Sequence, residues 1–174
     1  TPQGNTLFVS DTNKIYSAGR IKRLSLSSGQ TNLNTLVFMG GYDVDMQVFI
    51  TKLYTVFDIE RVAYYGEKDE MMEKIVEQAI GARVENFVDG DKLPVKGIDA
   101  RFTLNGNAVD AIMNGKRAII FSAFDKGTED LRALEGEFDY MFALTGADSV
   151  LNRFKPKRAI SYRYSRLYEN AEIN

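Results

Sequence analysis

Four aspartates are placed where acidic side chains could hold a metal ion. They are Asp43, Asp45, Asp99 and Asp125. Each lies at or just beyond the end of a predicted strand, and the carboxyl ends of parallel strands are where α/β folds bind ligands. Carboxylates of this kind bind Mg²⁺, which orients a water and neutralises the charge that develops on a phosphate. The pattern predicts a Mg²⁺ site at one sheet edge, with Asp43, Asp99 and Asp125 as catalytic residues and Asp45 as a further ligand.

The same acids also suit the first turns of helices, where negative charge is favourable beside free amide groups. This alternative explains Asp43 and Asp99 without any metal. Both interpretations stay open from the residues alone.

Composition narrows the chemistry that is possible. Among its 174 residues the chain has no Cys, His or Trp, so a thiolate nucleophile and a histidine base are excluded and a structural zinc site is nearly excluded. If the protein is an enzyme, carboxylates, Lys or Tyr must supply its catalytic groups. No run is long and apolar enough to cross a bilayer, and the first residues do not resemble a signal peptide, so we expect a cytoplasmic protein that does not enter membranes.

The apolar pattern predicts strands that alternate with helices. Predicted strands cover 36–39, 61–65, 83–88, 118–121, 140–144 and 158–164, and predicted helices cover 42–57, 70–80, 129–134 and 148–154. Such alternation is typical of βαβ units. We expect a three-layer α/β/α Rossmann-like domain with a mainly parallel sheet over residues 35–166, preceded by an extended or β-hairpin segment (1–34) and followed by a tail (167–174).

One further helix is predicted to begin near Asp99. A Lys96-Gly97 turn precedes it, and Ile98, Phe102, Val109 and Ile112 follow helical spacing. This helix would bring Asp99 to the edge where the strand 118–121 ends.

Two glycines, Gly40 and Gly41, follow the first buried strand and precede a helix. Glycines there can let backbone amides approach a phosphate, which is an alternative prediction of a nucleotide-binding or small-molecule-binding Rossmann-like protein. The complete dinucleotide motif is missing, and Asp43 and Asp45 would repel a phosphate.

Basic residues gather near the two ends of the chain, although its net charge is only −2. They are Lys14, Arg20, Lys22, Arg23, Arg153, Lys155, Lys157, Arg158, Arg163 and Arg166. If the two ends meet, these residues form one basic face for RNA. The alternative is scattered, solvated charge. The segment 162–168 mixes Tyr with Arg, which suits either stacking on single-stranded nucleic acid or an exposed edge strand.

Four local motifs occur in a familiar order along the chain. They are Leu36-Val-Phe-Met-Gly-Gly-Tyr-Asp43, Val62-Ala-Tyr-Tyr-Gly66, Lys96-Gly-Ile-Asp99 and Ile119-Ile-Phe-Ser-Ala-Phe-Asp125. In order and spacing the chain resembles the NYN family of PIN-like ribonucleases over about residues 35 to 165. That resemblance implies a PIN-like fold and a Mg²⁺-dependent endoribonuclease site.

The departures from the NYN pattern fall on its catalytic positions. Gly40 occupies the place of the first acid, Asp43 that of an Asn, and Phe124 and Lys126 those of later carboxylates. Only Asp99 matches a family acid. The resemblance therefore implies a degenerate domain that binds RNA or a protein partner, with an active endoribonuclease as the alternative.

Overall fold

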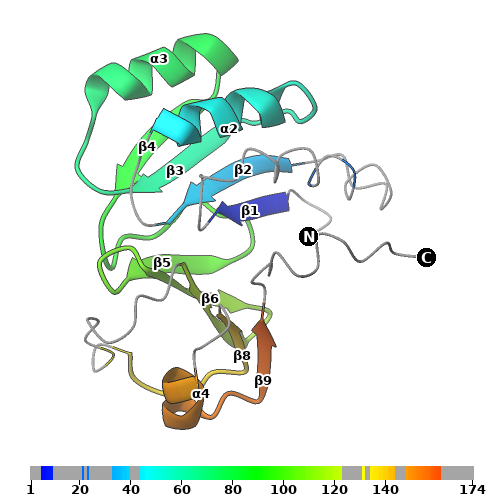
Figure 1. Ribbon diagram of the computed structural model, residues 1–174, viewed down its shortest axis with the longest axis vertical. Helices are drawn as coiled ribbons and strands as arrows, with labels where there is room; N and C mark the ends of the chain where they lie inside the picture. Colours follow the sequence, from blue (N-terminus) through cyan, green and yellow to red (C-terminus); the bar gives the residue numbers. More distant parts are fainter. Residues whose placement is uncertain are drawn as a thin grey trace.

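The computed structural model describes residues 5–9, 21, 23, 33–39, 44–122, 131, 134–143 and 148–161. These residues form an α/β structure with two sheets (Figure 1). The elements of the first half are β1 (Asn5–Val9), β2 (Leu33–Phe38), α2 (Val44–Tyr54), β3 (Arg61–Tyr65), α3 (Glu70–Ile80) and β4 (Arg83–Phe87). Those of the second half are β5 (Asp99–Thr103), β6 (Ala108–Met113), β7 (Lys116–Phe121), β8 (Tyr140–Ala143), α4 (Asp148–Phe154) and β9 (Arg158–Ser161).

The first sheet is parallel throughout, in the order β1-β2-β3-β4. Its central strand β2 is almost completely buried, as its continuous apolar run predicts. Helices α2 and α3 cover one face of this sheet (Figure 1). The predicted strands and helices between residues 36 and 88 are confirmed.

Helix α3 has the start and stop signals that its sequence predicts. The Asp69 side chain accepts a hydrogen bond from the Met72 amide at 3.0 Å, which caps the amino end. At the carboxyl end Gly81 adopts the left-handed conformation, with φ of 71°.

The second sheet is mixed, in the order β5-β6-β7-β8-β9. Strands β7, β8 and β9 are parallel, whereas β5, β6 and β7 form antiparallel hairpins. The prediction of a helix beginning near Asp99 is therefore wrong. Residues Asp99–Thr103 alternate between exposed and buried. The Asn-Gly pairs at 105–106 and 114–115 have positive φ in two hairpin turns, and Leu104 in the first turn has positive φ too.

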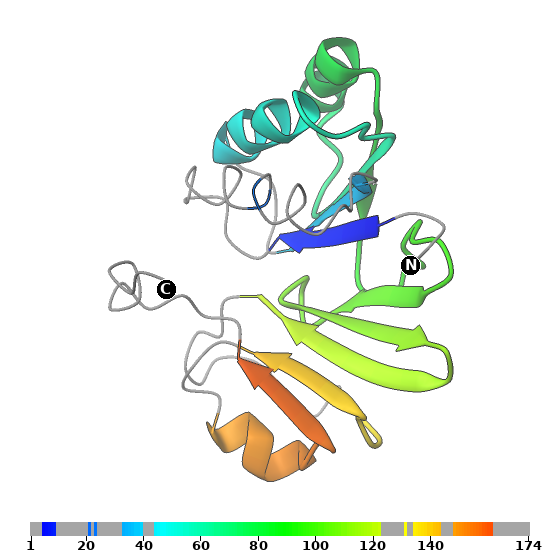
Figure 2. The same cartoon turned by 90° about the vertical axis from the view of Figure 1, so that its right-hand side faces the viewer.

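The two sheets face each other, so the described residues form four layers (Figures 1 and 2). Apolar side chains of β2 and β3, such as Val37 and Ala63, lie in one buried cluster with Phe102 and Val109 of the second sheet. The outer face of the second sheet is covered partly by α4 and by Phe138. The α/β class is confirmed, but a single sheet between two helical layers is not, because the hairpins replace the predicted crossover helix.

The amino-terminal segment joins the first sheet through β1. This strand lies in the segment predicted to be extended or a β-hairpin, and it is an edge strand that pairs in parallel with β2. Arg23, in the same segment, has helical backbone geometry and an exposed side chain. In the described part of the chain, no helix is long and apolar enough to span a membrane.

Candidate functional site

The carboxyl edge of the first sheet, where chemistry was predicted, is occupied by turns that bind one another. Both carboxylate oxygens of Asp89 accept backbone hydrogen bonds, from Asn105 N at 2.7 Å and Gly106 N at 3.1 Å. The Asn86 side chain donates to the Gly66 carbonyl at 3.2 Å. Asp89 thus holds the β5–β6 turn against the loop after β4, and Asn86 joins β4 to the turn after β3, so each group has a structural partner.

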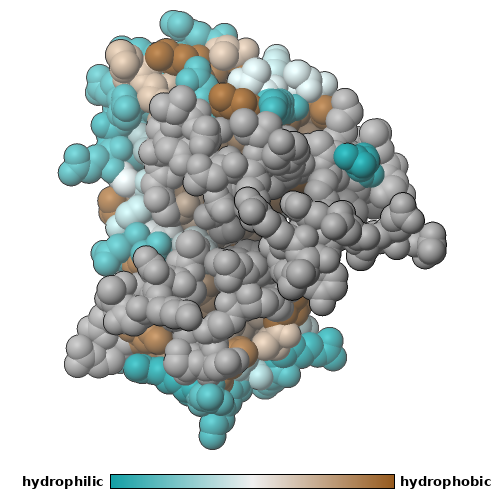
Figure 3. Space-filling view, viewed as in Figure 1, coloured by the Kyte–Doolittle hydropathy of each residue, from teal (hydrophilic) through white to brown (hydrophobic). Residues whose placement is uncertain are grey.

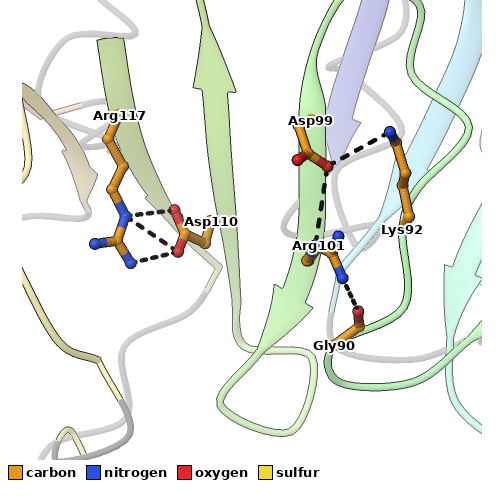
Figure 4. A network of polar contacts seen from close by, with 6 residues as sticks. All are labelled: Gly90, Lys92, Asp99, Arg101, Asp110 and Arg117. Atoms are coloured by element: carbon orange, nitrogen blue, oxygen red, sulfur yellow. Dashed lines mark hydrogen bonds and ion pairs between the residues drawn. The ribbon is translucent and has the colours of Figure 1, made fainter. Parts of the chain in front are cut away.

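Asp99 lies at the other end of the second sheet's first strand. Because it begins β5, it is separated from the β5–β6 turn by the length of that strand, about 13 Å at 3.3 Å per residue. Its carboxylate is 3.9 Å from Lys92 Nζ and 3.8 Å from Arg101 Nε (Figure 4). The Asp99 side chain is exposed, so its carboxylate forms surface ion pairs with two cationic side chains, Lys92 and Arg101.

The other predicted acids do not join Asp99 in the described structure. Asp45 is the second residue of α2, while Asp43 and Asp125 lie outside the described residues. In the ranges that the structure describes, no group of three or more acidic side chains is placed to hold a metal ion. The Mg²⁺ site predicted from Asp43, Asp45, Asp99 and Asp125 remains a prediction.

A basic surface is the clearest charged feature of the described residues. It consists of Lys116, Arg153, Lys155, Lys157 and Arg158, whose side chains are all exposed. Four of them lie within six consecutive residues, from the last turn of α4 to the first residue of β9. Lys116 begins β7, and because β7, β8 and β9 are parallel, the first residues of these strands share one edge.

The backbone of the basic surface is fixed by hydrogen bonds. Lys155 N donates to Leu151 O at 2.9 Å, which closes the end of α4. Lys157 N and Arg158 N donate to the carbonyls of Phe138 and Asp139, at 3.2 and 3.0 Å. The cations are thus presented by an ordered edge.

One carboxylate lies within this surface. Asp139 is 2.8 Å from Lys157 Nζ and 3.7 Å from Lys116 Nζ, and it accepts a hydrogen bond from Arg117 N at 3.0 Å. The hydrogen bond with Lys157 is the main reason that the pKa of Asp139 lies below its ordinary value, and the same contact raises the pKa of Lys157. Arg153, Lys155 and Arg158 form no ion pair with a described residue, although the Arg153 guanidinium lies over the Phe154 ring, 5.4 Å from its centroid.

Next to this surface, Arg117 joins the second sheet to the segment before β8. Its guanidinium binds Asp110 with both Nε (3.0 Å) and Nη2 (2.6 Å) (Figure 4). Its Nη1 donates to the Glu135 carbonyl at 2.7 Å. It also lies over the Phe138 ring, 4.5 Å from the centroid. Arg117 is therefore a structural residue, and its charge is already neutralised by Asp110.

The structure places only part of the predicted basic face. Arg153, Lys155, Lys157 and Arg158 come together as expected, and hydrophilic residues cover the lower end of the molecule in Figure 3, where α4 and β9 lie in Figure 1. Arg23 is exposed, whereas the other predicted members, Lys14, Arg20, Lys22, Arg163 and Arg166, lie outside the described residues. Lys116 was missed, because it joins the others only through the parallel pairing of β7, β8 and β9.

Comparison of the chain with family models, curated proteins and solved structures finds no match.

Proposed function

We propose that this chain binds RNA through the basic surface and does not cleave it. The observation that supports this most directly is the gathering of exposed cations at one ordered edge of a chain whose net charge is −2. Phosphate contacts by Lys and Arg supply most of the sequence-independent affinity for nucleic acids. The resemblance to NYN ribonucleases implies the same class of partner.

Binding without cleavage is favoured by the position of Asp99. It is the acid that best matches the NYN pattern, yet it lies beside Lys92 and Arg101 at the start of β5. Two cations beside a carboxylate disfavour Mg²⁺ there by like-charge repulsion. A catalytic site would require Asp99 to meet other acids, which the hairpin geometry does not favour.

The test is fluorescence anisotropy with a labelled single-stranded RNA at about 0.1 M salt. The variant R153Q/K155Q/R158Q removes three cations that have no ion-pair partner among described residues. At about 0.7 counterions per phosphate, losing three contacts weakens binding by about 100-fold at this salt concentration. The control is K52Q/K68Q/K74Q, which removes equal charge from α2, α3 and the loop before α3, in the layer farthest from α4 (Figure 1).

The proposal fails if both triple variants lose affinity equally, or if the wild-type chain binds no RNA at low salt. In that case a protein partner becomes the better explanation, with a shallow salt response and dependence on apolar anchors. Gel analysis of the RNA with Mg²⁺ and with chelator addresses the endoribonuclease alternative. Chelator-sensitive cleavage that D99N abolishes would contradict binding without cleavage.

A further inference from the structure

A pocket of about 530 Å³ opens at the amino edge of the first sheet, opposite to the edge where ligands were predicted. We call it the edge pocket. Its lining comes from the starts of β2 and β3 and from the loop before β5: Asn34, Thr35, Glu60, Arg61, Lys92, Leu93, Pro94, Val95 and Lys96. Its size is in the ordinary range for sites that bind small molecules.

The floor of the edge pocket is apolar and rigid. Leu93 and Val95 are buried and belong to the core between the two sheets. The loop that carries them is bound to β5. Leu93 N donates to Ala100 O at 2.8 Å, and the backbones of Lys92 and Arg101 form an isolated antiparallel β-bridge. A floor that is already formed needs little ordering when a ligand enters.

The rim of the edge pocket is predominantly cationic. Arg61, Lys92 and Lys96 are exposed, against the single carboxylate of Glu60. Lys92 lies near Asp99, but the side chains of Arg61 and Lys96 form no ion pair or hydrogen bond with any described residue. Two cations without partners above an apolar floor are complementary to a ligand that has a negative head and an apolar body.

We propose that the edge pocket binds a small amphipathic anion, with a carboxylate or phosphate head held by Arg61 and Lys96. The apolar part lies against Pro94, the partly exposed residue between the buried Leu93 and Val95. Arg offers a planar pair of donors that matches either head group, and Lys96 adds a second point charge. This site shares no residue with the basic surface, so the test of anion binding is independent of the test of RNA binding.

The test is a titration of the whole chain, followed by ¹H–¹⁵N correlation spectra, with probes that share an eight-carbon body. Octanoate and octyl phosphate carry the two candidate heads, while octylammonium and octanol carry a positive and a neutral head. We expect at least one anion to bind with a dissociation constant of about 1 mM or tighter. The cation should not bind measurably, and the stronger anion identifies the head group.

Variants separate this site from non-specific attraction. R61Q/K96Q should weaken anion binding by at least about tenfold, because one charged hydrogen bond already contributes about that factor and this variant removes both cations that hold the head group. K52Q/K74Q removes the same charge from α2 and α3 and should leave the dissociation constant unchanged. Melting temperatures of both variants show that the fold is retained, since exposed charges contribute little to stability.

The proposal is overturned if neither anion binds at 10 mM, or if octylammonium binds as well as octanoate. It is also overturned if R61Q/K96Q and K52Q/K74Q have equal effects.

Discussion

The substitution Tyr64→Phe tests how the end of β3 is joined to the start of α3. The Tyr64 hydroxyl donates to Glu73 Oε1 at 2.8 Å and accepts from Asp69 N at 3.0 Å. Tyr64 is 1% exposed and Glu73 8% exposed, so water cannot easily replace either contact. The variant keeps the ring and removes only the oxygen that both contacts require.

The expected cost follows from the two contacts. A hydrogen bond to a charged group contributes about 1.5–3 kcal/mol and one to a neutral amide about 0.5–1.5 kcal/mol, so we expect a loss of about 3 kcal/mol. For a chain of this size that corresponds to a melting temperature about 6–12 °C lower. Urea unfolding followed by circular dichroism measures the free energy directly.

The matched control is Tyr65→Phe, the same chemical change one residue later. Tyr65 lies on the other face of the strand, where its ring packs against Phe102 at 5.4 Å between centroids. Its hydroxyl has no hydrogen-bond partner among described residues, so this variant should stay within about 0.5 kcal/mol of wild type. A Y64F variant as stable as Y65F would refute the proposed role of the Tyr64 hydroxyl.

Three further predictions concern the rest of the fold. Burial is the main cause that raises the pKa of Tyr64 from 10.0 to about 12, so its contribution is complete below pH 10 and is lost between pH 10 and 12. Wild type should therefore lose up to about 3 kcal/mol more than Y64F over that range in urea unfolding at each pH, and equal losses would contradict this. Arg117→Lys should lower the free energy of unfolding by about 1–2 kcal/mol, because Lys cannot bind both oxygens of the Asp110 carboxylate. Arg101→Lys, in an exposed ion pair with Asp99, should lower it by less than about 0.5 kcal/mol. Equal melting temperatures for these two variants would contradict this. In Gly106→Ala the backbone keeps a φ of 76° and the new Cβ lies 2.1 Å from the Tyr65 ring, whereas in Gly97→Ala the φ is 75° and the Cβ lies in open space. Thermal melting should therefore show a loss of stability at least about 1 kcal/mol larger for G106A than for G97A. Equal losses would refute the steric contact with Tyr65.

The first sheet was predictable from sequence because its signals are local and agree with one another. The apolar run of β2 and the capped amphipathic pattern of α3 each specify one structure, and both are found. The carboxyl end of α3 was indicated by Gly81, whose left-handed conformation few other residues adopt readily.

Residues 99 to 113 were mispredicted because two periodicities compete there, whereas the strands predicted at 118–121, 140–144 and 158–164 and the helix at 148–154 are found, within the described residues, as β7, β8, β9 and α4. Ile98, Phe102, Val109 and Ile112 fit helical spacing, but the Asn-Gly pairs at 105–106 and 114–115 are stronger signals of hairpins. If these pairs had been interpreted as turns, β5 and β6 would have been predicted in addition to the strand at 118–121, and Asp99 would have been placed away from the carboxyl edge. The error moved a candidate catalytic residue to the wrong end of the sheet.

The basic surface was predictable in part. Four of its residues are close in sequence, so their proximity needed no fold. Lys116 joins them only because β7 and β9 are parallel with β8 between them, and the edge pocket depends on the contact of residues 92–96 with the starts of β2 and β3. Such long-range contacts are set by tertiary packing, which local patterns do not encode.

RNA binding through the basic surface is tested most directly by the salt dependence of affinity in wild type and R153Q/K155Q/R158Q. Each neutralised phosphate contributes about −0.7 to the slope of log K against log salt concentration, so the triple variant should have a slope shallower by about 2. The K52Q/K68Q/K74Q control should keep the wild-type slope. Equal slopes for wild type and R153Q/K155Q/R158Q would contradict RNA binding at this surface.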